Sequence, residues 1–330
     1  MRAAARFLCS MFVVSACSDV LAQGAPAASS TQTFPNRPIR MLVGFTPGGT
    51  TDVIARIVAQ KMSENLGRPV VVDNRPGAGA NIAAELAAKA PPDGYTTVCV
   101  NPGLAISASA YTRLSYNALR DLAPVARLAD STHLLIVHPS LPVKSIKDLI
   151  ALAKAKPGAL NFSSAGPGNA DHLAGELFKV AAGVDIVHVP YKGGAQAAQD
   201  TVTGQVSMYF SGILVGLPLA KAGRVKAIAV ATKVRSPVAP DIPTIAESGL
   251  PGYEMSLWNA LFAPAGTPRE LISRVNAEAL KALDAPDVKE RLLGAGAVPS
   301  GDSPEELGTF FKGEVARFAK VVHAIGLKLD

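Results

Sequence analysis

The sequence predicts an α/β protein built of two interleaved lobes. Short β-branched runs alternate with amphipathic helical patterns between Ile39 and about Val230, which is typical of βαβ units and parallel sheets. The 330 residues are 48% hydrophobic and 18% charged, a composition that supports one large or two medium cores and excludes intrinsic disorder. No polar linker divides the elements into consecutive domains. We therefore expect one strand near residues 126–137 to leave the first lobe and another near 258–263 to return to it.

The first residues have the order of a secretory signal. Two arginines precede an apolar stretch at residues 7–16, and small residues follow it. We expect signal peptidase to cleave after Ala22, which makes residues 1–22 a signal peptide and implies export of the mature protein. A lipobox is the alternative, in which the chain is cleaved before Cys17 and anchored by a lipid on that residue.

The folded part is expected to begin after a flexible leader at residues 23–33. Domain 1 is predicted to comprise residues 34–130 and 258–330, and domain 2 residues 131–257. The two crossing strands would form a hinge, and the space between the lobes is a natural ligand cleft. We interpret Trp258 on the return crossing as core or hinge packing, with a cleft-lining position as the alternative.

Each element follows from a local pattern. Short β-branched runs predict strands, and apolar residues three or four apart predict helices, as in residues 53–62 after the first strand. Two late helices are expected to begin at Thr267 and Ser303, because each is followed by Pro and then by Glu at the third position. The predicted strands cover residues 39–45, 69–73, 95–100, 133–138, 160–163, 186–189, 206–210 and 225–231.

Four loops of small residues are expected between a strand and the next helix. The first, residues 45–52, contains glycines that permit a tight turn, and the free N–H groups of a helix N-terminus favour an anion. Similar loops occur at residues 75–81, 163–169 and 191–194. Each alone is consistent with a simple turn, but open α/β sheets bind ligands at the carboxyl ends of their strands. Nucleotide binding is not expected, because the first loop lacks the P-loop Lys and Ile82 replaces the third glycine of a dinucleotide fingerprint.

The sequence lacks the common catalytic and metal-binding patterns G-x-S-x-G, H-E-x-x-H and C-x-x-C. Among the five histidines, His172 lies near Asp171 and Glu176 on one expected helix face, which we interpret as structural or solvent-exposed. No two of the 32 Lys and Arg residues are adjacent, which argues against a nucleic-acid partner. We expect a non-catalytic protein without a metal or cofactor. A secreted hydrolase that uses Ser164 and His172 is the weakest alternative.

Several motifs occur along the chain in a characteristic order. They are Phe-Pro-Asn-Arg-Pro-Ile-Arg (34–40), Pro-Gly-Gly-x-x-Asp (47–52), Val-Val-Asp-Asn-Arg-Pro-Gly-Ala-Gly (71–79), Pro-Asp-Gly-Tyr-Thr (92–96), His-Leu-Ala-Gly-Glu-Leu-Phe (172–178) and Val-Asp-Ile-Val-His-Val-Pro-Tyr-Lys-Gly (184–193). Together they closely resemble the Bordetella uptake gene (Bug) family, the solute receptors of tripartite tricarboxylate transporters. The resemblance covers essentially all of residues 34–330.

This resemblance implies a periplasmic binding protein fold of the type II-like class, with two lobes around a ligand cleft. It implies a receptor, a monomer in our prediction, that closes on a small organic mono- or dicarboxylate and offers it to inner-membrane permease subunits. A role in sensing, with the closed protein presented to a membrane sensor kinase, is the alternative.

The resemblance also implies the site. In the Bug family the carboxylate is held largely by backbone amides, hydroxyls and bridging waters. The matching positions are Thr46, Pro47, Gly48, Gly49, Thr50, Thr51, Asp52, Ala78, Gly79, Asn101, Ser164, Gly166, Asn169, Tyr191 and Ser211. The family often has Asp where this chain has Ser211, and such an acid would pair with a ligand ammonium. We therefore expect a non-amino carboxylate, aromatic or aliphatic.

Overall fold

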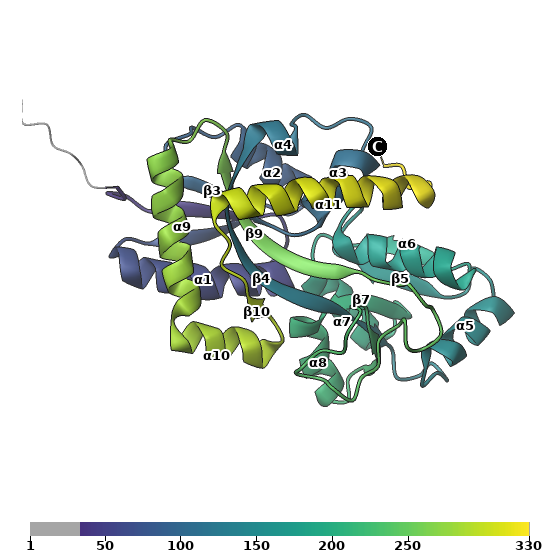
Figure 1. Ribbon diagram of the computed structural model, residues 1–330. Helices are drawn as coiled ribbons and strands as arrows, with labels where there is room; N and C mark the ends of the chain where they lie inside the picture. The colour runs from purple at the N-terminus through teal and green to yellow at the C-terminus, as the bar shows by residue number, and fades with distance from the viewer. Residues whose placement is uncertain (1–33, 330) are drawn as a thin grey trace, which may run out of the picture. The chain divides into compact units, whose positions relative to one another are not determined.

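The computed structural model describes residues 34–329, so the predicted signal peptide and the whole of the predicted leader lie outside the described residues. Strands and helices alternate along most of the described chain (Figure 1). The strands are β1 (Ile39–Val43), β2 (Val70–Asn74), β3 (Thr96–Val100), β4 (Leu122–Val137), β5 (Asn161–Ser164), β6 (Val187–Pro190), β7 (Met208–Gly212), β8 (Lys226–Val230), β9 (Ser256–Pro264) and β10 (Val298–Pro299).

The helices connect these strands and cover the sheet. Predicted strand positions agree with the observed ones to within a few residues, and the short β10 is the one strand that was not predicted among the described residues. The helices are α1 (Thr50–Leu66), η1 (Ala78–Ala80), α2 (Asn81–Ala88), α3 (Gly103–Ala110), α4 (Ala118–Asp121), α5 (Ile146–Ala155), α6 (Ala170–Ala182), α7 (Gly194–Thr203), α8 (Ile213–Lys221), α9 (Arg269–Asp284), α10 (Pro286–Ala295) and α11 (Pro304–Ala324).

The strands form one path in the order β2-β1-β3-β9-β4-β7-β5-β6, with β8 and β10 also pairing with β4. At one end β2, β1 and β3 are parallel, and at the other β7, β5 and β6 are parallel. We call the elements around β1–β3 the first lobe and those around β5–β7 the second lobe. The expected parallel βαβ units are present in both lobes, whereas β9 and β4 run antiparallel to their neighbours.

Two long strands carry the chain between the lobes. β4 pairs with β9 as far as Thr132 and, from His133 onward, with β7 and β8. The long course of β4 and β9 side by side is visible in Figure 1. β4, with 16 residues, contains the strand expected near residues 126–137 and begins four residues earlier, at Leu122. Its first residues, with Pro124 and register shifts against β9, lack the continuous apolar run found at residues 134–137. The domain boundaries given above remain a prediction.

Apolar side chains pack on both faces of the sheet. Met41 and Val43 of β1 belong to the core shared with α1 and α9, whereas the intervening Leu42 belongs to the core on the opposite face. Trp258 is buried in this second core, where it packs edge-on against Phe310 and Phe311 of α11. Its indole N–H donates to Glu314 Oε2 at 2.8 Å. Trp258 is therefore a core residue and does not line the cleft.

The two late helices begin differently. Ser303 and Glu306 form a complete capping box at the start of α11, as predicted. The box predicted at Thr267 is wrong, because α9 has Pro268 at its N-cap and no side-chain cap. The Thr267 hydroxyl instead donates backward to the Pro264 carbonyl at 2.7 Å. Sequence spacing identified both helices but could not determine which way the hydroxyl turns.

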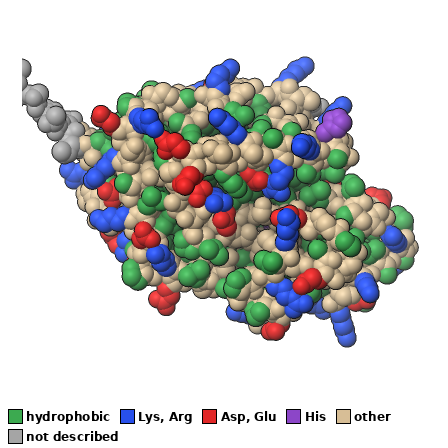
Figure 2. Space-filling view, viewed as in Figure 1, with side chains coloured by type: hydrophobic (Ala, Val, Ile, Leu, Met, Phe, Trp, Pro, Cys, Tyr) green, Lys and Arg blue, Asp and Glu red, His purple; other side chains and the backbone are tan. Residues whose placement is uncertain are grey.

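Figure 2 shows acidic and basic side chains interspersed over the visible face, without a continuous patch of one sign. Over residues 34–329 none of the helices combines the length and apolar character needed to cross a membrane.

Candidate ligand-binding cleft

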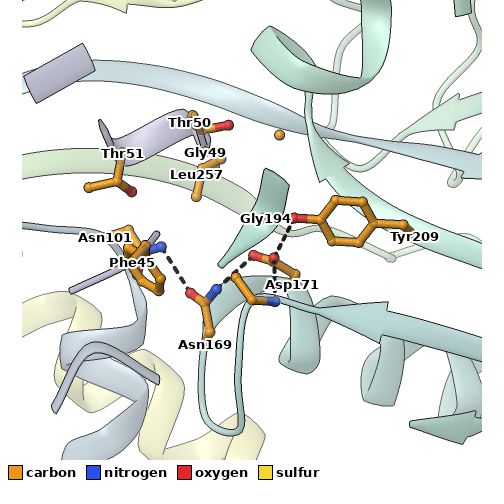
Figure 3. Close-up of a pocket in the computed structure, with 12 residues that line it drawn as sticks. Phe45, Gly49, Thr50, Thr51, Asn101, Asn169, Asp171, Gly194, Tyr209 and Leu257 are labelled. Atoms are coloured by element: carbon orange, nitrogen blue, oxygen red, sulfur yellow. Dashed lines mark hydrogen bonds between the residues drawn. The ribbon is translucent and has the colours of Figure 1, made fainter. Parts of the chain in front are cut away.

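A small cleft lies between the carboxyl ends of strands from both lobes. It encloses a void of about 20 Å³. Figure 3 shows its walls, with Asn101 and the start of α1 facing α6 and β7 across it. The lining residues are Phe45, Gly49, Thr50, Thr51, Asn101, Ala165, Asn169, Asp171, Gly194, Tyr209, Gly212 and Leu257.

The first-lobe wall is the loop between β1 and α1. Gly49 is the N-cap of α1 and offers no side-chain acceptor to the first helical N–H groups. Asp52 fixes this loop from beneath, because its carboxylate accepts from Gly48 N at 2.9 Å, from Asn74 Nδ2 at 2.7 Å and from Arg56 Nε at 2.9 Å. Burial alone would raise the pKa of Asp52, but these hydrogen bonds outweigh it and hold the pKa below its ordinary value. The Asp52 charge is thus already partnered and lies outside the cleft lining.

The second-lobe wall is the loop between β5 and α6. Asn169 caps α6 by accepting from Ala170 N at 2.6 Å. Asp171, in the first turn of α6, accepts from Ala165 N at 3.1 Å, from Asn169 Nδ2 at 3.0 Å and from Tyr209 Oη at 2.8 Å. The loop after β5, strand β7 and the start of α6 therefore fix the side chains that face the first lobe (Figure 3).

Several helix N-termini meet at the cleft. α1, α7 and α8 begin after Gly49, Gly193 and Gly212, and in none of them does a side chain cap the first N–H groups. Unpaired N–H groups and the helix dipole give each terminus a partial positive charge that favours an anion. No Lys or Arg is among the residues that line the cleft. The cleft can therefore hold a carboxylate through backbone N–H groups and hydroxyls rather than through an ion pair.

The two lobes touch directly around the cleft. Asn101 Nδ2 in the first lobe donates to Asn169 Oδ1 in the second at 2.9 Å, and Tyr111 Oη donates to the Pro167 carbonyl at 3.0 Å. Thr46 N donates to the Lys192 carbonyl at 3.2 Å. The cleft is therefore closed, with its walls held together by polar contacts on several sides.

The structure brings five of the predicted site residues to the cleft wall: Gly49, Thr50, Thr51, Asn101 and Asn169. Five others support the walls or the contact between the lobes. Gly48 and Asp52 hydrogen-bond to each other and shape the first loop. Thr46 N donates to the second lobe, and Gly79 of the first lobe lies against Gly166 of the second. The remaining residues of the set, Pro47, Ala78, Ser164, Tyr191 and Ser211, are likewise outside the lining.

Two residues of that remaining set have well-defined partners elsewhere. Tyr191 Oη donates to Asp200 Oδ2 at 2.6 Å, and Ser211 is fully buried with its hydroxyl donating to the Gly212 carbonyl at 3.1 Å. Pro47 and Ala78 are exposed. Which of the fifteen residues contact the ligand remains a prediction.

Seven lining residues were not in the predicted set: Phe45, Ala165, Asp171, Gly194, Tyr209, Gly212 and Leu257. Gly194 lies in the fourth small-residue loop and Ala165 in the third, so the loop pattern in the sequence already pointed to their segments. Tyr209 lies two residues before the predicted Ser211, and Gly212 lies one residue after it. Asp171 was assigned to a helix surface with His172, but its carboxylate lies between Asn169 and Tyr209 (Figure 3).

Two histidines stack beneath the second-lobe loop. The rings of His172 and His188 are 3.8 Å apart, and Gly168 N donates to His172 Nδ1 at 3.1 Å. Burial lowers the pKa of His172 to about 3 and that of His188 to about 4. Ser164 Oγ lies 2.6 Å from His188 Nε2, so the serine and histidine of the hydrolase alternative are not partners. The described residues also contain no group of three side chains that could hold a metal ion.

Comparisons with known proteins agree with this architecture. The family model described as the tripartite tricarboxylate transporter family receptor matches residues 54–327. A protein encoded in the tcbD–tcbE intergenic region of a Pseudomonas species is 43% identical over 296 residues, which are 89% of this chain and 88% of that protein. BugT of Bordetella pertussis is 37% identical over 308 residues, 93% of this chain and 94% of BugT.

Solved structures show the same fold. A protein of R. palustris solved with adipate is 38% identical with a TM-score of 0.87, over 89% of this chain and 99% of that one. MatC from Rhodopseudomonas palustris, solved with bound malate, is 34% identical with a TM-score of 0.85, over 88% of this chain and 100% of MatC. The periplasmic binding protein BugD is 33% identical with a TM-score of 0.87, over 89% and 99%. The chain therefore belongs to the Bug family of tripartite tricarboxylate transporter receptors, which are periplasmic solute-binding proteins and not enzymes.

Proposed function

We propose that this receptor captures a small organic carboxylate in the interlobe cleft and delivers it to the inner-membrane permease of a tripartite tricarboxylate-type transporter. The observation that carries the proposal is the convergence of three glycine-capped helix N-termini on a cleft without Lys or Arg. Such termini bind anions through N–H groups that no side chain occupies. Support comes from the relatives solved with adipate and with malate.

The ligand would first meet the first lobe. Gly49, Thr50 and Thr51 offer backbone N–H groups and hydroxyls at the start of α1, and Asn101 lies beside them (Figure 3). Asn169 would then approach the same carboxylate from the second lobe. Closure follows because the closed state adds second-lobe contacts that the open state lacks, and a ligand shifts an equilibrium by that difference in affinity.

The small void limits how a ligand can enter the cleft. About 20 Å³ accommodates roughly one water molecule. A carboxylate with several carbons therefore needs the lobes to separate before it enters and to close less tightly around it. The segments that bend in this motion would be β4 and β9, the long strands that connect the two lobes.

We further propose that the mature protein begins after Ala22 and acts as a soluble monomer in the periplasm, with lipidation at Cys17 as the alternative processing. The genes beside its own distinguish the two proposed partners. Genes for a small and a large membrane subunit would support transport, whereas an adjacent sensor-kinase pair would support sensing.

A thermal-shift panel tests the ligand class. Protein unfolded and refolded to remove bound ligand is screened against mono- and dicarboxylates of different lengths. An acid present at 100 times its Kd is expected to stabilise the protein by about 2.7 kcal/mol. The cleft variant Asn169→Ala should show a smaller ligand-induced shift, relative to its own ligand-free Tm. Asn65→Ala is the control, because Asn65 lies near the far end of α1. A panel in which no carboxylate shifts the transition would contradict the proposal.

A further inference from the structure

One acidic side chain reaches the cleft of this anion-binding protein. Among the described residues that line the cleft, Asp171 is the only one with a charged side chain. It is buried, at 5% exposure. From the sequence we expected no acid at the ligand, because Ser211 occupies the position where relatives often have Asp. The structure supplies a carboxylate from a different element, the first turn of α6.

The negative charge of Asp171 has no Lys or Arg partner among the described residues. Its three hydrogen-bond donors are the Ala165 N–H, the Asn169 amide and the Tyr209 hydroxyl, and all three are neutral. The nearest basic group is the His133 ring, whose Nε2 lies 3.6 Å from Asp171 Oδ1 and makes no hydrogen bond. No Lys or Arg forms an ion pair with Asp171 in the described part of the chain.

Asp171 also lies close to the expected site of the ligand's first carboxylate. The Tyr209 hydroxyl that donates to Asp171 is 2.7 Å from the position of a Cβ on Gly194, and Gly194 N is 3.5 Å from that of a Cβ on Gly49. Tyr209 and Gly194 therefore lie in close succession between Asp171 and the N-terminus of α1. Gly49 and Asp171 line the same small void, so a ligand whose carboxylate is held at Gly49 has Asp171 among the residues that surround the rest of its chain (Figure 3).

We infer that Asp171 determines specificity and selects monocarboxylates over dicarboxylates. This inference rests on the proposed carboxylate-receptor function. A second ligand carboxylate would be enclosed beside the Asp171 carboxylate, and like charges repel strongly in a site from which water is excluded. A neutral or hydrogen-bond-donating group at that end is not repelled. Specificity then comes from the unfavourable contact with the wrong ligand as much as from contacts with the right one.

The test compares acids that match in length and differ in charge. Succinate is paired with 4-hydroxybutyrate, and adipate with 6-hydroxyhexanoate, in isothermal titration at pH 8, above the usual titration range of histidine. The wild type should bind the better hydroxy acid about tenfold or more tightly than the diacid of equal length, a difference of about 1.4 kcal/mol. Asp171→Asn should reduce that ratio to about threefold or less by strengthening diacid binding.

Asp185→Asn is the matched control, because it removes the same charge from an exposed position on the second lobe outside the cleft lining. It should keep the wild-type ratio. Tighter diacid binding by the wild type, or an unchanged ratio in Asp171→Asn, would overturn the inference and leave the receptor function intact. If Asp171→Asn does not fold, the wild-type ratio decides alone. Failure of all four acids to bind the wild type would instead overturn the proposed receptor function, and the inference with it.

Discussion

Gly79 is a single residue on which closure depends. It has a φ of +62°, and a Cβ at this position would lie 2.1 Å from the carbonyl oxygen of Pro167 in the opposite lobe. Backbone cannot move aside as a flexible side chain can. Any side chain at residue 79 would therefore hold the two lobes apart.

We predict that Gly79→Ala weakens carboxylate binding by about tenfold or more, because the added methyl group prevents full closure. Gly183→Ala is the matched control, since Gly183 has a φ of +59° and a Cβ there would have nothing within 4 Å of it. Both variants should lose a similar free energy of unfolding, roughly 1–2 kcal/mol, from the left-handed backbone. Titration calorimetry and urea unfolding separate the two effects. Equal affinities in the two variants would contradict this account of Gly79.

The stacked histidines make stability depend on pH. Burial disfavours the charged imidazole and lowers the pKa of His172 to about 3 and of His188 to about 4. In the unfolded chain a histidine titrates near pH 6.5, so below that pH the unfolded state binds more protons. The contribution of the neutral pair is thus complete above about pH 6.5 and is lost as the pH falls toward 4.

We predict that the free energy of unfolding falls between pH 6 and 4.5 by up to about 1.4 kcal/mol per pH unit for each of these histidines. His188→Phe should remove roughly half of this slope, while Ser164 keeps its hydrogen bonds to Gly166. Urea unfolding at several pH values measures the slope of the unfolding free energy against pH. The pH 8 values give the packing cost of the substitution, because both histidines are then neutral in either state. Parallel wild-type and His188→Phe curves would disprove this assignment.

At the scale of elements, caps differ in strength although their sequences look alike. Ser303 accepts from Glu306 N at 3.2 Å and so satisfies a helical N–H group of α11, whereas the Thr267 hydroxyl satisfies no N–H group of α9. A lost cap leaves backbone N–H groups without a partner.

We predict that Ser303→Ala lowers the free energy of unfolding by about 1 kcal/mol. Thr267→Ala should cost less, because it removes one hydroxyl bond to a carbonyl and leaves the N-terminus of α9 as it was. Urea unfolding of both variants at pH 7.5 provides the comparison. A larger loss for Thr267→Ala would show that the capping box predicted from sequence forms in solution.

Periodicity and turn residues predicted most elements of the fold, because both act over a few residues. The start of β4 was placed four residues too late, since its first residues owe their place in the sheet to β9, more than a hundred residues later in the sequence. The candidate site divides in the same way. Small-residue loops identified the segments, but the inward direction of Asp171 in α6 depends on Tyr209 of the distant strand β7. Contacts between distant elements leave no local pattern in the sequence.

For the whole molecule, the two lobes share the long strands β4 and β9, and their walls meet through Asn101, Asn169 and other polar contacts. When a ligand binds between these walls, its own contacts with both lobes replace some of the direct contacts between the lobes. Closure and binding are then one coupled equilibrium, and the acid stabilises the closed form by its extra affinity for that form.

Small-angle X-ray scattering of ligand-stripped protein, with and without the acid that gives the largest thermal shift, tests this coupling most directly. We expect a larger radius of gyration without acid, and a decrease on saturation to the value calculated from the closed lobes. The Gly79→Ala variant should stay larger at the same acid concentration. An acid that binds stoichiometrically while the wild-type scattering curve stays unchanged would contradict the central claim that the lobes close on a carboxylate.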